Sequence, residues 1–115
     1  MFADLPPQQM HCVAAAVYHE ARGESTVGQR AVAHVVLNRA KKRKLTPCQV
    51  ITQPGQFHFR MKVSYSGNMW KKALQVAHYP GLDPTGGAHY FHNKKVRPGW
   101  GKQVTTIIGN HLFYK

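Results

Sequence analysis

The first third of the chain carries apolar residues at helical spacing. Between residues 8 and 22 they recur every three or four positions, which predicts a helix with one apolar face. Gly23 is expected to end this helix in the left-handed conformation that glycine adopts at low cost. Thr26, followed three residues later by Gln29, predicts a capping box for a second helix that runs to about Lys41. Its expected core face consists of Val27, Ala31, Val35 and Val36.

Two shorter helices are expected in the middle of the chain. Thr46 and Pro47 have the residue types of an N-cap and a first helical position, and they predict a third helix over residues 48–52. Residues 56–66 predict a loop or a short strand. A fourth helix is expected over residues 68–78, capped by its first residue, with Trp70, Leu74 and Ala77 facing inward.

The C-terminal third changes from helical to strand-like patterns. Residues 79–87 are rich in proline and glycine and predict an irregular, tightly turned loop. Residues 88–92 predict a strand. Residues 103–108 and 111–114 flank Gly109-Asn110, a pair that suits the two-residue turn of a hairpin. Helices followed by a small antiparallel sheet predict an α+β fold, built as a single domain over residues 1–115.

Charge narrows the choice of partners without deciding it. The chain of 115 residues has 16 Lys and Arg against 4 Asp and Glu, a formal charge of +12. This balance predicts an anionic partner: a nucleic acid, an acidic membrane surface or a bacterial envelope. Because acids are so few, any carboxylate chemistry must come from Asp4, Glu20, Glu24 or Asp83.

Glu20 has the placement of a general acid. It lies in the last predicted turn of an apolar helix, which would hold its side chain rigidly. Apolar neighbours and the negative end of the helix dipole both disfavour its ionised form and would raise its pKa. Arg22 and Arg30 would oppose that effect, and a carboxylate at a helix end is also a common surface residue.

The other two carboxylates leave alternatives open. Glu24 could pair with Arg22 or Arg30, could lie at the start of the second helix, or could contact substrate. Asp83 begins an Asp-Pro-Thr-Gly-Gly sequence, which is typical of a structural turn, with a second catalytic carboxylate as the alternative. Both are therefore secondary catalytic candidates behind Glu20.

The cysteine and histidine patterns point to no metal and no cofactor. Cys12 and Cys48 could form one bridge, but free cysteine is a residue type of protein cores, and reduced core cysteines are the favoured interpretation. The eight histidines lack the spacing of a zinc protease motif, and packing or surface roles are expected. The first twelve residues lack the pattern of a signal peptide, so synthesis in the cytoplasm without an export signal is expected.

Several segments together resemble the SleB/CwlJ-type cell wall hydrolase domain of the spore-cortex-lytic enzymes and their relatives. The likeness covers nearly the whole chain in the order of that family. The segments that carry it are AVYHEARGE at 16–24, GQRAVA at 28–33, VVLNR at 35–39, VITQPGQF at 50–57, DPTGGAHYFHN at 83–93 and IGNHLFY at 108–114.

This resemblance implies peptidoglycan as substrate, cleaved between N-acetylmuramic acid and N-acetylglucosamine, commonly by lytic transglycosylation. It implies a lysozyme-like α+β domain with a groove, and it places the catalytic glutamate of the family at Glu20. Together with the aromatic residues of the C-terminal half, it suggests the following substrate contacts: Tyr18, Gln56, Phe57, Tyr90, His92, Asn93, Trp100 and His111.

Three departures from typical relatives are expected: an unusually basic balance with the basic run at 41–44, no exported leader, and no separate peptidoglycan-binding repeat. They favour a monomeric phage or prophage lysin, released by a holin or carried on a virion, with the basic surface attracted to anionic envelope polymers. Three alternatives stay open: a hydrolytic muramidase with a second carboxylate, a basic nucleic-acid-binding module, and an inactive wall-binding module.

Overall fold

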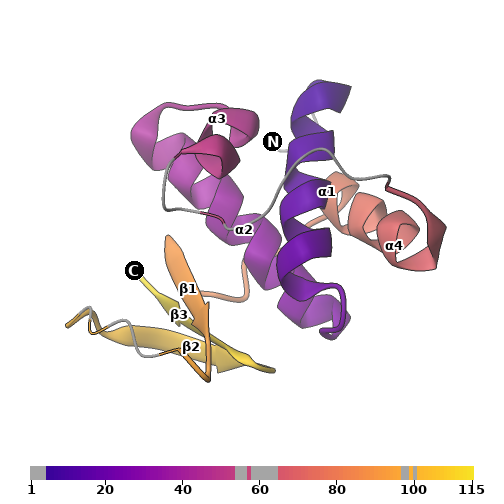
Figure 1. Ribbon diagram of the computed structural model, residues 1–115. Coiled ribbons are helices and arrows are strands. Elements are labelled where there is room, and N and C mark those ends of the chain that lie inside the picture. The colour runs from indigo at the N-terminus through magenta and orange to yellow at the C-terminus, as the bar shows by residue number, and fades with distance from the viewer. Residues whose placement is uncertain (1–4, 54–56, 58–64, 97–98, 100) are drawn as a thin grey trace.

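The computed structural model describes residues 5–53, 57, 65–96, 99 and 101–115. Within these residues four helices precede a three-stranded antiparallel sheet, so the predicted α+β class is confirmed. Figure 1 shows the helices gathered on one side and the sheet on the other, with α2 between α1 and the strands. The elements are α1 (Pro7–Ala21), α2 (Thr26–Arg43), α3 (Pro47–Thr52), α4 (Gly67–His78), β1 (Tyr90–Asn93), β2 (Val104–Ile108) and β3 (His111–Tyr114).

The connection between α1 and α2 differs from its prediction in two details. Gly23 is not among the glycines with positive φ, and Arg22, the last residue before it, keeps a right-handed helical conformation. The cap of α2 is Ser25, whose hydroxyl accepts a hydrogen bond from the backbone N–H of Gly28; Thr26 is already helical. Serine and threonine cap helices equally well, so sequence alone could not decide which of two neighbours does so.

The shorter helices show one prediction confirmed and one wrong. Thr46 caps α3, and the side chain of Gln49 reaches back to the Thr46 N–H, which completes a capping box. Helix α4 begins at Gly67 after Ser66, so the predicted cap at Asn68 is wrong. Gly67 has φ of 88°, a left-handed conformation that suits glycine, and it follows the extended backbone of Ser66. Ser66 makes no side-chain cap hydrogen bond.

The main core lies among the helices. Val13, Val17, Val32 and Val36 are fully buried there, on the facing surfaces of α1 and α2. Trp70 and Ala77 of α4 close the same core from the far side of α1, as predicted, whereas Leu74 is only half-buried. Val27 is 48% exposed, so its predicted core position is wrong: Gly28 and Gln29 in the same turn are buried, and Val27 lies on the outer side of the helix.

Cys12 of α1 and Cys48 of α3 form a disulfide, which contradicts the expectation of reduced core cysteines. Their Cα atoms lie 5.1 Å apart, a separation that a disulfide spans. The two residues are 36 positions apart in the sequence, and they meet only because α3 packs against α1. Only Cys12 is buried, and Cys48 is half-exposed, so the pair lies at the edge of the core.

The sheet has the strand order β1-β3-β2, so β3 is central. The hairpin predicted around Gly109-Asn110 is confirmed, and Gly109 has φ of 56°. The first strand runs over Tyr90–Asn93, slightly later than the predicted 88–92. Phe113 of β3 is fully buried against Ala31 and Val35, and these contacts attach the sheet to α2.

Candidate functional site

Glu20 lies one residue before the end of α1 and is half-buried. The residues that precede it on the helix, from Cys12 to Val17, are all buried, so the last turn of α1 projects from a rigid base. This is the placement that the sequence predicted. A carboxylate on such a base is held in one position relative to a bound substrate, which general acid catalysis requires.

A group of aromatic side chains lies around Tyr18 and His19, the two residues that precede Glu20 on α1. His19 Nε2 and the Tyr65 hydroxyl share a hydrogen bond of 2.9 Å. The Tyr65 ring stacks on Trp70 at 4.4 Å between centroids, and Tyr18 meets both rings edge to face. Burial and the nearby Arg22 guanidinium lower the pKa of His19, so the imidazole is neutral at pH 7. Tyr18 and Tyr65 are only partly buried and keep ring surface of the kind on which sugar rings stack, whereas Trp70 is buried in the core.

Tyr18 is one of the substrate contacts expected from the sequence. His19 is not among them, and Tyr65 is one of the aromatic residues of the C-terminal half that were expected to offer stacking surfaces. The position of His19 next to Glu20 was the one signal available for it. Tyr65 is 46 residues away from His19 and comes beside it only through the packing of α4 on α1. No local pattern could have found that pair.

Glu24 is bound to the hairpin turn. Its two carboxylate oxygens accept hydrogen bonds from the backbone N–H of Asn110, at 2.9 Å, and from the Asn110 side-chain amide, at 3.0 Å. A Cβ at Gly109 would collide with the same carboxylate, so the turn needs glycine there. The hydrogen bond from the Asn110 backbone lowers the pKa of Glu24 more than burial raises it. The pairing with Arg22 or Arg30 is not what the structure shows.

Asp83 is a turn residue, the interpretation that the sequence favoured. Its Oδ1 accepts from the Thr85 N–H at 2.8 Å and the Thr85 hydroxyl at 2.6 Å. Its Oδ2 accepts from the Asn38 amide at 3.0 Å and the Gly87 N–H at 3.2 Å. Burial disfavours the ionised carboxylate, but the hydrogen bonds from Thr85 and Asn38 outweigh it, so the pKa of Asp83 is lowered. Asp83 therefore ties the loop before β1 to α2.

The remaining predicted contacts lie along the sheet. Tyr90 begins β1 and Asn93 ends it, directly opposite His111. His111 is buried, with Nδ1 3.9 Å from a Glu24 oxygen, and burial lowers its pKa. His92 Nε2 lies 2.6 Å from the Tyr114 hydroxyl.

Phe57 packs with Phe91 at 6.1 Å between ring centroids and is buried, so its exposed surface is small. Gln56 and Trp100 lie outside the described residues. The candidates thus fall into three places. Tyr18 lies two residues before Glu20 on α1, His111 and Asn93 lie at the Glu24 end of the sheet, and Tyr90 and Phe57 lie near the end of α2.

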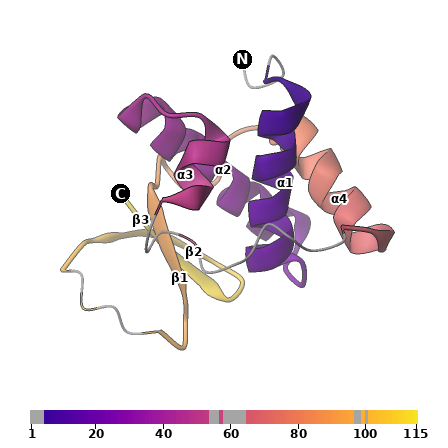
Figure 2. The same cartoon turned by 45° about the horizontal axis from the view of Figure 1, so that its top comes forward.

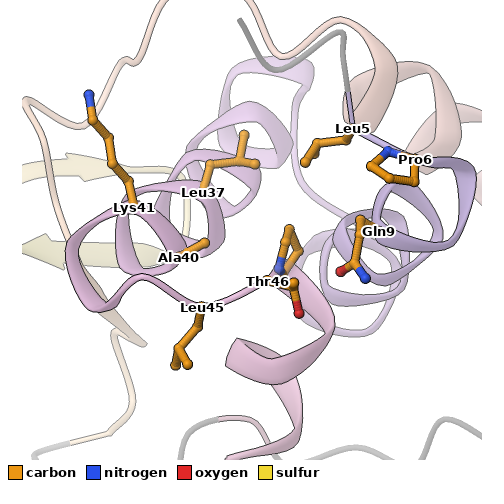
Figure 3. Close-up of a pocket in the computed structure, with 9 residues that line it drawn as sticks. Leu5, Pro6, Gln9, Leu37, Ala40, Lys41, Leu45 and Thr46 are labelled. Carbon is orange, nitrogen blue, oxygen red and sulfur yellow. The ribbon is translucent and has the colours of Figure 1, made fainter.

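An apolar cavity of about 490 Å³ opens at the other end of α1 (Figure 3). Leu5 and Pro6 form one side of it, and Leu37 and Ala40 of α2 form the other. None of the described residues that line it is a carboxylate. Gln9, which also lines it, is eleven residues before Glu20, about 16 Å along the helix. This cavity is therefore separate from the candidate catalytic position.

Among the residues that the structure describes, no three or more His, Cys, Asp or Glu side chains are grouped so that they could hold a metal ion. None of the described helices combines the length and the apolar character needed to cross a membrane.

Comparison with known proteins connects this geometry to a family. Residues 23–114 match the family model described as Cell Wall Hydrolase. The match includes Glu24 and Asp83 and begins three residues after Glu20. The Spore cortex-lytic enzymes of Bacillus cereus and Oceanobacillus iheyensis are each 34% identical, over 110 and 114 residues, and each alignment covers 90% of this chain. The chain spans only 42% and 40% of the lengths of these two relatives.

Two solved structures share the fold. The catalytic domain of the Bacillus cereus SleB protein superposes with a TM-score of 0.79 at 34% identity, covering 96% of this chain and 91% of that one. The catalytic domain of the germination-specific lytic transglycosylase SleB from Bacillus anthracis gives 0.77 at 32% identity, covering 97% and 98%. The resemblance found in the motifs is thus confirmed for the family and the fold, and the chain belongs to the Cell Wall Hydrolase family.

Proposed function

We propose that this chain is a peptidoglycan-cleaving enzyme that acts by lytic transglycosylation, with Glu20 as its single catalytic carboxylate. The observation that carries the proposal is the position of Glu20 on the last turn of a buried helix, in a fold shared with the catalytic domain of a lytic transglycosylase. The Spore cortex-lytic enzymes, to which the chain is similar, support the same substrate class.

The state of the other carboxylates favours a one-carboxylate mechanism. Retaining hydrolysis needs a second carboxylate as nucleophile, and inverting hydrolysis needs one as a base for water. Glu24 accepts hydrogen bonds from Asn110, and Asp83 accepts four hydrogen bonds from its own loop and α2. These hydrogen bonds support a structural role for both carboxylates. Asp4 lies outside the described residues.

A lone glutamate can complete the reaction if the substrate supplies the nucleophile. Glu20 would donate its proton to the glycosidic oxygen as the bond to C1 of N-acetylmuramic acid breaks. The resulting carboxylate would then accept the proton of the muramic acid 6-hydroxyl as that oxygen forms its bond to C1. No water is consumed, so the product is a 1,6-anhydro-muropeptide. The rings of Tyr18 and Tyr65 are suited to pack against the sugar while positive charge develops on it.

Digestion of purified peptidoglycan tests this proposal. Glu20→Gln should keep the fold and lose lytic activity by at least 10²-fold, the lower range for general acid catalysis. Glu24→Gln is the matched control because it makes the same chemical change four residues away, and it should lose far less. A folded Glu20→Gln variant with half the normal rate would refute the assignment.

Mass spectrometry of the unreduced products decides between lyase and hydrolase. Anhydro products, one water lighter than reducing muropeptides, are expected. Reducing ends that borohydride converts would instead mean a hydrolytic muramidase, and Asp83 and Glu24 would be the next carboxylates to test. Absence of any cleavage, combined with retention on DNA that survives high salt, would favour the nucleic-acid-binding alternative.

We further propose that the enzyme acts as an endolysin-like protein outside the cytoplasm, as one catalytic domain and as a monomer. Two observations support this. The formal charge of +12 suits attraction to anionic envelope polymers. The Cys12–Cys48 disulfide suits an oxidising compartment, where such bonds persist. Coexpression with a holin tests release: lysis that depends on the holin is expected, and lysis without it would contradict the endolysin role.

A further inference from the structure

Three cationic side chains surround one tyrosine at the start of β1. The Arg39 guanidinium lies 4.9 Å from the centre of the Tyr90 ring, and the Lys102 ammonium lies 4.4 Å from it. Arg43 donates a hydrogen bond to the Tyr90 hydroxyl at 3.3 Å, and its other terminal nitrogen donates to Gln53. We call Arg39, Arg43, Tyr90 and Lys102 the Tyr90 cluster.

Among the described residues, no ion pair joins a carboxylate to Arg39, Arg43 or Lys102. Glu24 is bound at the opposite end of the sheet, and Asp83 is occupied by Thr85, Asn38 and Gly87. The partial negative charge at the C-terminal end of α2 offsets the three cations only in part. Three cations held around one ring repel one another, so an anion that binds between them would gain from all three.

Arg39 fixes the position of the cluster. Arg39 is buried, with only 5% of its surface exposed, and its Nε donates a hydrogen bond to the backbone carbonyl of His89. Its guanidinium also lies 5.4 Å from the centre of the Phe57 ring. Its Nη1 is buried without a hydrogen-bond partner. Burial, with repulsion from Arg43, lowers its pKa to about 10, so it stays charged at pH 7. A buried cation with an unused donor is costly unless negative charge comes near.

We propose that the Tyr90 cluster binds a free carboxylate of the stem peptide on the glycan strand that Glu20 cleaves. Arg43 and Lys102 are exposed and would contact the carboxylate, while the buried Arg39 holds the Tyr90 ring in position. The inference rests on the proposed function, because the stem peptides carry the carboxylates of peptidoglycan. The Arg43 guanidinium has the planar geometry that matches a carboxylate.

The length of the sheet suits this arrangement. Strand β1 extends for about 10 Å from Tyr90 to Asn93, which faces His111 and the Glu24 end of the hairpin. An extended peptide of three to four residues spans about 10–14 Å. A stem peptide that leaves the glycan near the end of α1 and follows β1, an edge strand, can therefore bring its later carboxylates to the cluster.

Two glycan substrates test the subsite by cleavage: strands with intact stem peptides, and strands stripped of them by an amidase. Wild type should have the lower KM on stem-bearing strands. The double variant Arg43→Gln with Lys102→Gln should reduce this KM ratio about tenfold. Lys71→Gln with Lys72→Gln on α4 removes the same charge elsewhere and should keep the ratio. Equal loss in both double variants, or no preference in wild type, would overturn the proposal.

Direct binding separates this proposal from the proposed function. Calorimetric titration with a free stem tetrapeptide should show a Kd about tenfold weaker for Arg43→Gln with Lys102→Gln than for wild type, and this readout does not require cleavage. An unchanged Kd overturns the subsite even if glycan strands are cut. Binding of a soluble teichoic acid polymer in place of the tetrapeptide would assign the cluster to phosphodiesters and also overturn it.

Discussion

The helices of this protein are held to one another mainly by apolar packing, whereas the sheet is held in place mainly by polar contacts. Among the helices, valines and alanines of α1 and α2 are excluded from solvent, and Trp70 adds an aromatic side chain from α4. The sheet contributes a smaller core: Phe113 of β3 is buried against α2 together with Ala88 of the preceding loop, while β2 is mostly exposed. Figure 2 shows the same separation, with the strands set apart from α1 and α4.

Polar groups compensate for the small core of the sheet. Glu24 holds the hairpin turn, Asp83 and Asn38 hold the loop before β1, and Arg39 donates to the carbonyl of His89. The Thr105 hydroxyl adds a bond to the carbonyl of Thr85. Hydrogen bonds are directional, so they fix where the sheet lies relative to Glu20 more sharply than apolar contacts of the same small area would. Substitutions should therefore affect the two regions differently.

Removal of the disulfide should give the largest loss of stability, and it should act on the helices. Cys12→Ser with Cys48→Ser opens a loop closed across 36 positions, for which chain entropy predicts a loss of about 4 kcal/mol. Urea denaturation followed by far-ultraviolet circular dichroism measures it. Wild type in reductant should match the double variant, and a loss below about 1 kcal/mol would mean that helix packing alone holds α3 in place.

Asp83→Asn should come next, and it should act on the sheet. An amide nitrogen in place of Oδ2 would face the Asn38 amide and the Gly87 N–H, and one in place of Oδ1 would face the N–H and hydroxyl of Thr85. Leaving such groups unsatisfied costs about 1–3 kcal/mol. Thermal unfolding measures the loss. The control Lys95→Gln, an exposed side chain, should change stability by less than about 0.5 kcal/mol. Equal stability of Asp83→Asn would show that water replaces these bonds.

Glu24→Gln should have a smaller, local effect. Glutamine can still accept the bond from the Asn110 backbone, but its amide nitrogen replaces one charged acceptor, at a cost of about 1 kcal/mol. Faster hydrogen exchange of the Asn110 amide, with unchanged exchange in α1, is the expected signature. Exchange that rises equally in both regions would contradict the separation of sheet and helices.

Acid should lower the stability of the chain in two steps. Burial lowers the pKa of His111, His89 and His19 below 6.5, so the unfolded chain binds their protons first, and stability falls as pH drops below 6.5. The pKa values of Glu24 and Asp83 are lowered as well, so their contribution is lost only as pH falls below about 4. Thermal unfolding from pH 8 to 3 tests both steps. A stability maximum at pH 5 would contradict the histidine part.

Local patterns predicted most of the fold because each depends on residues close in sequence. The apolar spacing of α1, the Thr46 cap with Gln49, and the glycine turn of the hairpin each lie within one element or one turn. Errors came where two neighbours had equal propensity, as with Ser25 and Thr26. The general-acid role of Glu20 stays a prediction, although its place at the end of α1 is as expected.

What the sequence by itself determined is therefore the order of the elements, the turn at Asp83, the rigid helix beneath Glu20 and the family to which the motifs point. Only the tertiary structure decided that Cys12 pairs with Cys48, that Glu24 holds Asn110, and that Tyr65 meets His19. The separations of these pairs are 36, 86 and 46 residues. Short-range propensity carries no information across such distances; the meeting of these residues follows from how α1, α2 and the sheet pack, which depends on the whole core at once.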